Sequence, residues 1–156
     1  MPASRSISIR PLVAADHEQW YPLWRGYQQF YQADIAPEVS RVTWTRLLDP
    51  QEPMGGAVAA DGATLVGIVH WIFHRSCWTI GDYCYLQDLF VAPGLRGGGV
   101  GRKLIEHVYG VAQARDCSRV IWLTQETNTE AMKLYDRIAE RSGFVQYCHP
   151  LNGNPT

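Results

Sequence analysis

A run of glycines is the first feature of the sequence that could do chemistry. Five of the 14 glycines lie between Gly94 and Gly101, within the segment VAPGLRGGGVGR at residues 91–102. A strand that passes through glycines into a helix presents unpaired backbone N–H groups and the positive end of the helix dipole. Such a segment can bind phosphate without a side chain, although a flexible turn with glycine caps would contain the same residues.

Two common nucleotide-binding motifs are absent from this glycine run. A Walker A loop requires a Gly-Lys pair followed by Ser or Thr, and the sequence contains no Gly-Lys pair. The dinucleotide fingerprint GxGxxG fails because Arg102 stands where its third glycine is required. Nucleotide hydrolysis and NAD binding therefore lose their main support.

The second feature is an acidic residue, Asp88, in the otherwise mainly apolar run LQDLFV at residues 86–91. An unpaired carboxylate in a buried strand costs several kcal/mol. Asp88 therefore indicates either a structural tie to a backbone N–H or an arginine, or a role as a base or cation ligand. Glu126 is a second acidic residue that could face the same cleft.

The five histidines show no spacing typical of metal ligands on one helix. His70 and His74 are four residues apart, but they fall in a strand pattern, in which such residues lie ~13 Å apart. We therefore expect no metal site. Both histidines could be auxiliary bases, and the other interpretation is a partly buried, hydrogen-bonded histidine.

Hydrophobic spacing predicts the elements that position these residues. An Asp-Gly pair at residues 61–62 predicts a hairpin, Asp16 is a candidate N-cap, and Thr127 with Glu130 forms a capping box. These elements predict a mixed α/β fold class, in which helices flank a mainly antiparallel sheet with one parallel crossover. Strands are predicted at residues 7–11, 57–60, 65–73, 83–91, 120–123 and 144–147, and helices from 16 to 31, over 39–48, from 101 and from 127 to 143.

Length and composition predict a single domain over residues 1–156. The chain has 46% apolar residues, and 14 basic against 15 acidic residues give a net charge of -1, which disfavours general nucleic-acid binding. No apolar run approaches the ~18 residues of a membrane helix, and the start has no apolar stretch between its charges. We therefore expect a soluble cytoplasmic protein with no membrane partner.

The four cysteines form no CxxC pair, and we expect them to be reduced and buried.

The spacing Arg96-x-x-Gly99-x-Gly101 resembles the pyrophosphate loop of the GNAT superfamily of acyl-CoA-dependent N-acetyltransferases. The segment LFV at residues 89–91 resembles the strand that precedes this loop in the family, and NTEAMKLY at residues 128–135 resembles a later helical block. The resemblance covers roughly residues 65–147. It implies the GNAT acyl-CoA N-acyltransferase fold, acetyl-CoA as co-substrate and a possible homodimer.

One departure from the family concerns the last helix. Gly143 and Phe144 come eight residues after Tyr135, where most relatives have a spacing of about four. The four additional residues are close to one helical turn of ~3.6 residues. We therefore expect a longer helix that keeps the orientation of Tyr135.

The resemblance also implies roles for particular residues. Tyr135 would protonate the departing CoA thiolate, and backbone N–H groups near Val91 would meet the acetyl oxygen. Asp88 would be the base or the amine ligand, because residues 86–91 resemble the strand of diamine and polyamine acetyltransferases. Gln87 stands where those relatives usually have an acid. The implied cofactor-binding residues are Leu89, Phe90, Val91, Arg96, Gly97, Gly98, Gly99, Val100, Gly101, Arg102, Asn128 and Tyr135, and the implied substrate-binding residues are Gln87, Asp88, Glu126, Tyr27 and Tyr31.

The leading hypothesis is acetyl transfer from acetyl-CoA to a primary amine of a diamine, polyamine or amino acid. In the family the first helices line the acceptor cleft, so Tyr27, Phe30 or Tyr31 would favour an amine by cation–π contact. One alternative is a protein or histone-tail lysine acetyltransferase, as in yeast relatives of the histone and polyamine type. Another is a non-catalytic acyl-CoA-binding module, against which the presence of both Asp88 and Tyr135 argues.

Overall fold

The computed structural model describes residues 6–151. Contacts divide the chain into two compact units, of which the first ends at Leu123 and the second begins at Thr124. Each unit is described by itself below. A single domain over the whole chain stays a prediction.

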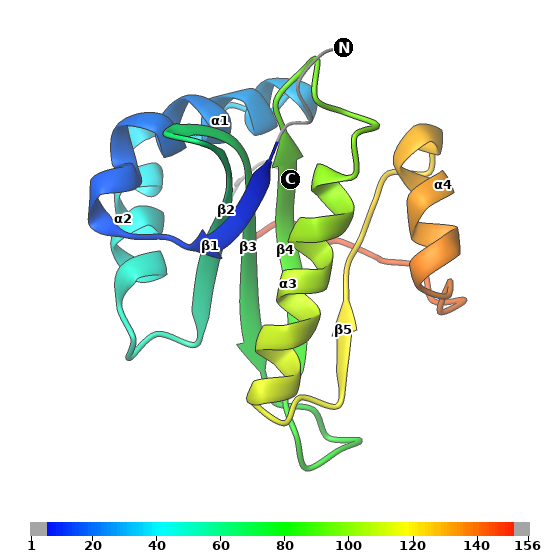
Figure 1. Cartoon of the computed structure of the whole chain (residues 1–156). Helices are drawn as coiled ribbons and strands as arrows, with labels where there is room; N and C mark the ends of the chain where they lie inside the picture. Colours follow the sequence, from blue (N-terminus) through cyan, green and yellow to red (C-terminus); the bar gives the residue numbers. More distant parts are fainter. Residues whose placement is uncertain (1–5, 152–156) are drawn as a thin grey trace. The chain divides into compact units, whose positions relative to one another are not determined.

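The first unit contains a five-stranded sheet in the order β1-β2-β3-β4-β5 (Figure 1). All neighbouring strands are antiparallel except β4 and β5, which are parallel and joined through helix α3 (Val100–Ala114). This arrangement confirms the predicted mixed α/β class with one parallel crossover. The strands are β1 (Ile7–Pro11), β2 (Met54–Asp61), β3 (Thr64–His74), β4 (Tyr83–Val91) and β5 (Arg119–Ile121).

The two faces of the sheet are covered by different helices. On one face His70 of β3 accepts a hydrogen bond from Trp20 of α1 (His17–Phe30). Trp71, the next residue of β3, lies against His107 of α3, with ring centroids 6.0 Å apart. Because successive side chains of a strand point to opposite faces, α1 and α3 lie on opposite sides of the sheet.

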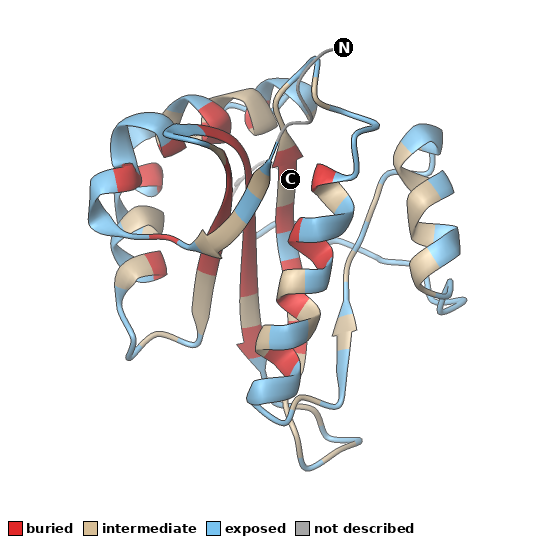
Figure 2. Cartoon of the chain, viewed as in Figure 1, coloured by how far each residue is buried: buried red, intermediate tan, exposed pale blue. Residues whose placement is uncertain are grey.

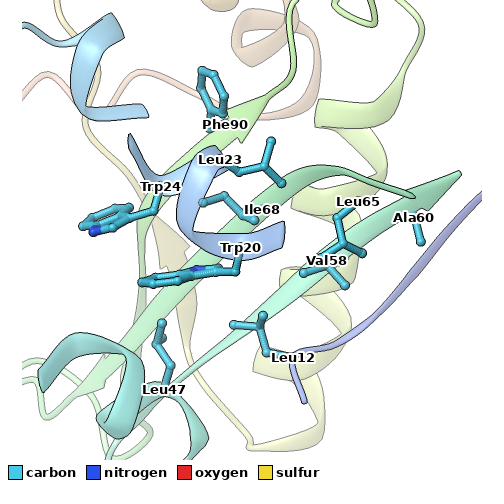
Figure 3. Packing of buried hydrophobic residues seen from close by; sticks show 10 residues of the cluster. All are labelled: Leu12, Trp20, Leu23, Trp24, Leu47, Val58, Ala60, Leu65, Ile68 and Phe90. Atoms are coloured by element: carbon cyan, nitrogen blue, oxygen red, sulfur yellow. The ribbon is translucent and has the colours of Figure 1, made fainter. Parts of the chain in front are cut away.

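The main core lies between α1, α2 (Pro37–Leu48) and the sheet (Figures 2 and 3). Trp20 is fully buried and stacks on Trp24 with ring centroids 5.9 Å apart, while Leu47 of α2 packs into the same cluster. Each large apolar side chain buried in this way contributes ~1.5–3 kcal/mol. The aromatic face that the sequence predicts for the first helix is therefore largely core.

The first helix starts directly after Asp16, as predicted. The Asp16 carboxylate does not cap α1; it accepts hydrogen bonds from the backbone N–H of Val13 at 2.9 Å and from the Arg10 guanidinium at 2.8 Å. It thus stabilises the short 3-10 turn Ala14–Asp16 before the helix and ties it to β1.

Helix α4 (Thr129–Ile138) forms in the second unit, and it corrects two expectations. Its N-cap is Asn128 and not Thr127, so the predicted capping box does not form; the Thr129 N–H instead bonds the Thr127 carbonyl in a tight turn. The helix also gains no additional turn. Ala139 leaves it in extended backbone, and the Arg141 guanidinium reaches back to the Asp136 carboxylate at 3.2 Å.

The predicted last strand at residues 144–147 is wrong as well. This segment has no strand conformation, and Phe144, Val145 and Tyr147 are mostly exposed. A strand needs a neighbour that satisfies its backbone groups, and within residues 6–151 no other strand pairs with this segment. Alternating apolar residues alone do not supply that neighbour.

The cysteines match the expectation only in part. All four are free thiols, but Cys84 alone is buried, while Cys77 and Cys148 are exposed. Burial raises the pKa of the Cys84 thiol to about 12. In the part of the chain that the structure describes, no helix is long and apolar enough to cross a membrane.

Candidate active site

A β-bulge at Gln87 shapes the candidate site. Asp88 pairs with His70 of β3, but Leu86 pairs with the next residue, Trp71, so Gln87 is the additional residue on β4. A regular strand would place Tyr85 and Asp88 on opposite faces, because they are three residues apart. The bulge shifts the alternation, and both side chains lie on the face that α1 covers.

Asp88 is buried, with 8% of its surface exposed, and its carboxylate has a specific partner. Its Oδ2 lies 3.0 Å from Nδ1 of His70, which is itself 2% exposed. The Nε2 atom of the same ring accepts a hydrogen bond of 3.0 Å from the Trp20 indole. The tie of Asp88 is therefore a histidine of the neighbouring strand and not an arginine.

Three tyrosines surround the Asp88 carboxylate. Tyr27 and Tyr31 come from the end of α1, and Tyr85 comes from β4. Burial raises the pKa of all three phenols, and the negative charge of Asp88 raises each pKa further. For Tyr27, a hydrogen-bonding interaction with Asp88 contributes to the raised pKa as well. These phenols therefore stay protonated at neutral pH.

Aromatic rings continue along α1 beside this carboxylate. Trp24 stacks on Tyr27 with ring centroids 5.2 Å apart and an angle of 9° between the planes, and Tyr27 lies 4.9 Å from Tyr31. A cation against such rings gains ~0.5–2 kcal/mol in addition to its attraction to a carboxylate. The arrangement is chemically suited to an ammonium group.

The structure brings Tyr27 and Tyr31, two of the predicted substrate-binding residues, near Asp88. Their role in binding a substrate stays a prediction. Sequence reasoning missed Tyr85, because strand alternation without the bulge turns it to the other face. It also missed Trp20, and it considered His70 only as an auxiliary base. His74 is exposed at the end of β3, and its Nδ1 atom interacts with the Arg75 carbonyl at 2.8 Å.

The glycine segment between β4 and α3 has a backbone that requires glycine. Gly97 and Gly99 have φ angles of +86° and +82°, in the left-handed region that other residues rarely adopt. The first hydrogen bond of α3 runs from the Lys103 N–H to the Gly99 carbonyl at 3.1 Å. The N–H groups of residues 100–102 precede that bond, which is the arrangement that binds anions at helix starts.

Arg96 connects this loop to the face of the sheet that carries Asp88. Its guanidinium lies over the rings of Phe30 and Phe90, 5.1 and 5.3 Å from their centroids, and its Nε donates to the Val91 carbonyl at 3.2 Å. Arg102, by contrast, pairs with Glu106 one turn further along α3. The Arg96 side chain therefore holds the loop against α1 and β4.

Strands β4 and β5 separate after a short contact. Only Tyr83–Tyr85 of β4 pairs with Arg119–Ile121 of β5. From Leu86 to Val91, β4 keeps a ladder partner on one side only among the described strands. The central strand therefore diverges from β5, and backbone groups are left open on that side.

The remaining predicted residues lie in the second unit. Glu126 is exposed, and the Asn128 amide donates to the Thr124 hydroxyl at 3.2 Å. Tyr135 is half-buried on the same helical face as Ala131 and Leu134. Among residues 6–151, no group of three or more histidine, cysteine or acidic side chains could hold a metal ion.

The glycine loop connects strand β4 to the start of α3, next to the edge of β4 that β5 leaves open. This arrangement is typical of the class of acyl-CoA N-acyltransferases. Residues 13–139 match the model of the acetyltransferase (GNAT) family, and the chain belongs to this family. The predicted GNAT fold, N-acetyltransferase activity and acetyl-CoA co-substrate are thereby confirmed.

Two curated relatives act on amino-acid amines according to their names. The chain is 36% identical over 143 residues to the D-amino-acid N-acetyltransferase HPA3 of Saccharomyces cerevisiae, covering 90% of this chain and 89% of that enzyme. It is 37% identical over 93 residues to the thialysine N-epsilon-acetyltransferase of Mus musculus, covering 56% of this chain and 54% of that enzyme.

Solved structures share the fold at low sequence identity. The aminoglycoside N-acetyltransferase AAC(6')-Iy in complex with CoA has a TM-score of 0.82 at 17% identity, over 96% of this chain and 98% of that one. The ribosomal-protein-alanine N-acetyltransferase of Brucella melitensis has a TM-score of 0.79 at 21% identity, over 94% of this chain and 100% of that one. These likenesses show the fold.

The contact between Tyr27 and Asp88 leads to a prediction about stability and pH. A phenol whose pKa is raised by folding stabilises the folded state below its ordinary pKa of about 10, and this stabilisation is lost as pH rises further. We expect Tyr27→Phe to lower the unfolding free energy at pH 7 by ~1.5–3 kcal/mol and to make its decline above about pH 10 shallower. Urea denaturation at several pH values measures the unfolding free energy at pH 7 and its decline at high pH, and Tyr21→Phe is the control. Parallel pH curves for Tyr27→Phe and the wild type would contradict this assignment.

Proposed function

We propose that this protein transfers the acetyl group of acetyl-CoA to a primary amine of a small molecule, with Asp88 as the residue that receives the amine. The observation that carries the proposal is the buried carboxylate of Asp88 between the rings of Tyr27, Tyr31 and Tyr85. The names of the two related enzymes favour an amino acid as the acceptor, for example a D-amino acid or thialysine. Diamines and polyamines share the ammonium group that this site suits.

The acceptor half of the reaction begins with an ammonium that must lose a proton. Asp88 either orients the cation while water takes the proton, or takes the proton itself. The lone pair of the neutral amine then attacks the thioester carbonyl carbon, and the C–N bond forms as the C–S bond breaks. The electrons of the C–S bond leave with sulfur, which takes a proton from the Tyr135 hydroxyl. The nitrogen, which carries a positive charge after the attack, loses a second proton to solvent and becomes the neutral amide. Tyr135 recovers a proton from solvent, so the net reaction releases one proton.

The donor half uses mainly the backbone. The glycine loop and the N–H groups at the start of α3 would hold the pyrophosphate of acetyl-CoA. Open backbone groups of β4 near Val91 would stabilise the negative charge on the acetyl oxygen, because β5 does not pair with this part of β4. Arg96 would support the loop through Phe30 and Phe90, in addition to any contact with the cofactor.

Two other functions remain alternatives: acetylation of a lysine in a protein or histone tail, and acyl-CoA binding without turnover. A panel of D-amino acids, thialysine, polyamines and lysine peptides, assayed by release of the free CoA thiol, separates all three. Release with small amines alone supports the proposal. Preference for peptides, or acetyl-CoA binding without thiol release, would overturn it. A homodimer and a cytoplasmic location stay predictions.

The glycine loop yields a prediction about cofactor binding. Gly99→Asp adds a negative charge and a side chain at a φ of +82°, so we expect the affinity for acetyl-CoA to fall at least tenfold, about 1.4 kcal/mol. Calorimetry measures this affinity. Gly110→Asp is the matched control, because Gly110 lies further along the same helix, where an added Cβ meets nothing within 4 Å. Unchanged binding in Gly99→Asp would remove the loop from the cofactor site.

Tyr135 yields a prediction about the chemical step. Tyr135→Phe keeps the ring and removes the proton donor, so turnover should fall by roughly 10² to 10⁴ with little change in acetyl-CoA binding. Single-turnover kinetics with saturating amine measure this loss. Wild-type turnover in the variant would show that water or another group protonates the thiolate.

For Asp88 we expect one of two kinetic signatures in the variant Asp88→Asn. If the carboxylate orients a cation, KM for the amine should rise about tenfold or more; if it is the base, turnover should fall and the acid limb of the pH profile should change. Circular dichroism and acetyl-CoA affinity control for folding. Normal kinetics across pH would make Asp88 structural and would shift the search for the amine site to Glu126.

A further inference from the structure

The hydrogen-bonded chain from Trp20 through His70 to Asp88 joins α1, β3 and β4 beneath the candidate amine site. We propose that His70 is a positioning residue for Asp88, fixed by Trp20 as the neutral tautomer that carries its proton on Nδ1. This inference rests on the proposed function only in so far as Asp88 receives the amine. The tautomer itself follows from the donors and acceptors in the chain.

The hydrogen bond from the Trp20 indole determines the tautomer of the His70 ring. The Trp20 Nε1–H group is a donor only, and it lies 3.0 Å from His70 Nε2, so Nε2 must be the acceptor and carries no proton. The single proton of the neutral ring is then on Nδ1, 3.0 Å from Asp88 Oδ2. Nδ1 donates and the carboxylate oxygen accepts, which satisfies all three groups.

This arrangement argues against His70 as a base. A proton on Nε2 would face the indole N–H of Trp20, and both groups would be buried donors without an acceptor, which is strongly unfavourable. Trp20 cannot easily turn away, because it is fully buried and packs against Trp24 and Trp44. His70 therefore orients Asp88 and does not take the substrate's proton.

The ring of His70 is confined from several sides. Trp24 lies 5.3 Å from it between ring centroids, and a Cβ at Gly56 of β2 would approach its Cδ2 atom to 3.2 Å. Glycine at position 56 thus leaves room for the His70 imidazole as well as for Leu12, which such a Cβ would approach more closely. The titratable groups beside this hydrogen-bonded chain are Tyr27, Tyr31 and Tyr85 at Asp88, and His17 and Tyr21 at Trp20.

The consequence for Asp88 is a fixed orientation. A carboxylate offers roughly four lone-pair directions, and the hydrogen bond from His70 uses one of them. The remaining directions are available to an ammonium group. A freely rotating carboxylate would lose entropy on binding the amine, and the tie to His70 removes this cost before the substrate arrives.

Nitrogen NMR of the wild-type protein tests the tautomer without any substrate. We expect the His70 ring, assigned by comparison with His70→Asn, to show a protonated Nδ1 and an unprotonated Nε2 at pH 7. A proton on Nε2, or a doubly protonated ring, would overturn the inference. The protonation of the ring is read from the wild-type protein alone, and His70→Asn serves only to assign the signal.

Steady-state kinetics with thialysine and D-alanine as probes test the positioning role. His70→Leu should raise KM for the amine about tenfold or more with little change in KM for acetyl-CoA. His70→Asn, whose amide can donate near the position of Nδ1, should return the amine KM to within about threefold of the wild type. His74→Asn is the matched control on the same strand, and it should leave both constants unchanged.

The outcomes separate this inference from the proposed function. If Asp88→Asn impairs the amine step but His70→Leu does not, the proposed function stands and the positioning role falls. If His70→Leu impairs both substrates equally and His70→Asn gives no rescue, His70 is merely structural and the inference again falls. If Asp88→Asn is itself silent, the proposed function fails, whereas the tautomer is still decided by NMR.

Discussion

Burial of one carboxylate is the constraint around which the described site is organised. Asp88 lies on a central strand against a helix, where an uncompensated charge costs several kcal/mol. The neighbouring strand supplies His70, the covering helix supplies Trp20 to orient His70, and the Tyr27 phenol lies near the carboxylate. Much of the aromatic content of α1 therefore has two functions, because the same rings that fill the core also hold the acidic group.

The bulge at Gln87 is the backbone feature that makes this arrangement possible. It lets β4 present Tyr85 and Asp88 to one face while Leu86 remains on the face of α3. Bulges are common beside active sites because they redirect a side chain without disrupting the rest of the ladder. Further along β4, separation from β5 opens the backbone. In the proposed reaction this one strand would therefore serve the amine through a side chain and the thioester through main-chain groups.

In the proposed function, binding of the cofactor would depend less on side chains than binding of the amine would. Glycines at φ angles near +85° turn the chain so that the free N–H groups of α3 follow the loop directly. Arg96 fixes this loop through aromatic rings of α1 and β4. Helix α1 thus contacts both Asp88 and Arg96 of the glycine loop, so in the proposed function it would link the sites of the two substrates physically.

The sequence by itself determined the elements whose signals are local. Asp61-Gly62 specified the hairpin of β2 and β3, the glycine run specified the strand-to-helix loop, and Asp88 was identifiable as a charge in an apolar strand. Tertiary structure decided what surrounds that charge. Register between strands placed the bulge, and packing of α1 brought Trp20 to His70, neither of which has a signature along the chain. The unformed strand at residues 144–147 shows the same limit, because strand formation requires a partner that alternation within one segment cannot specify.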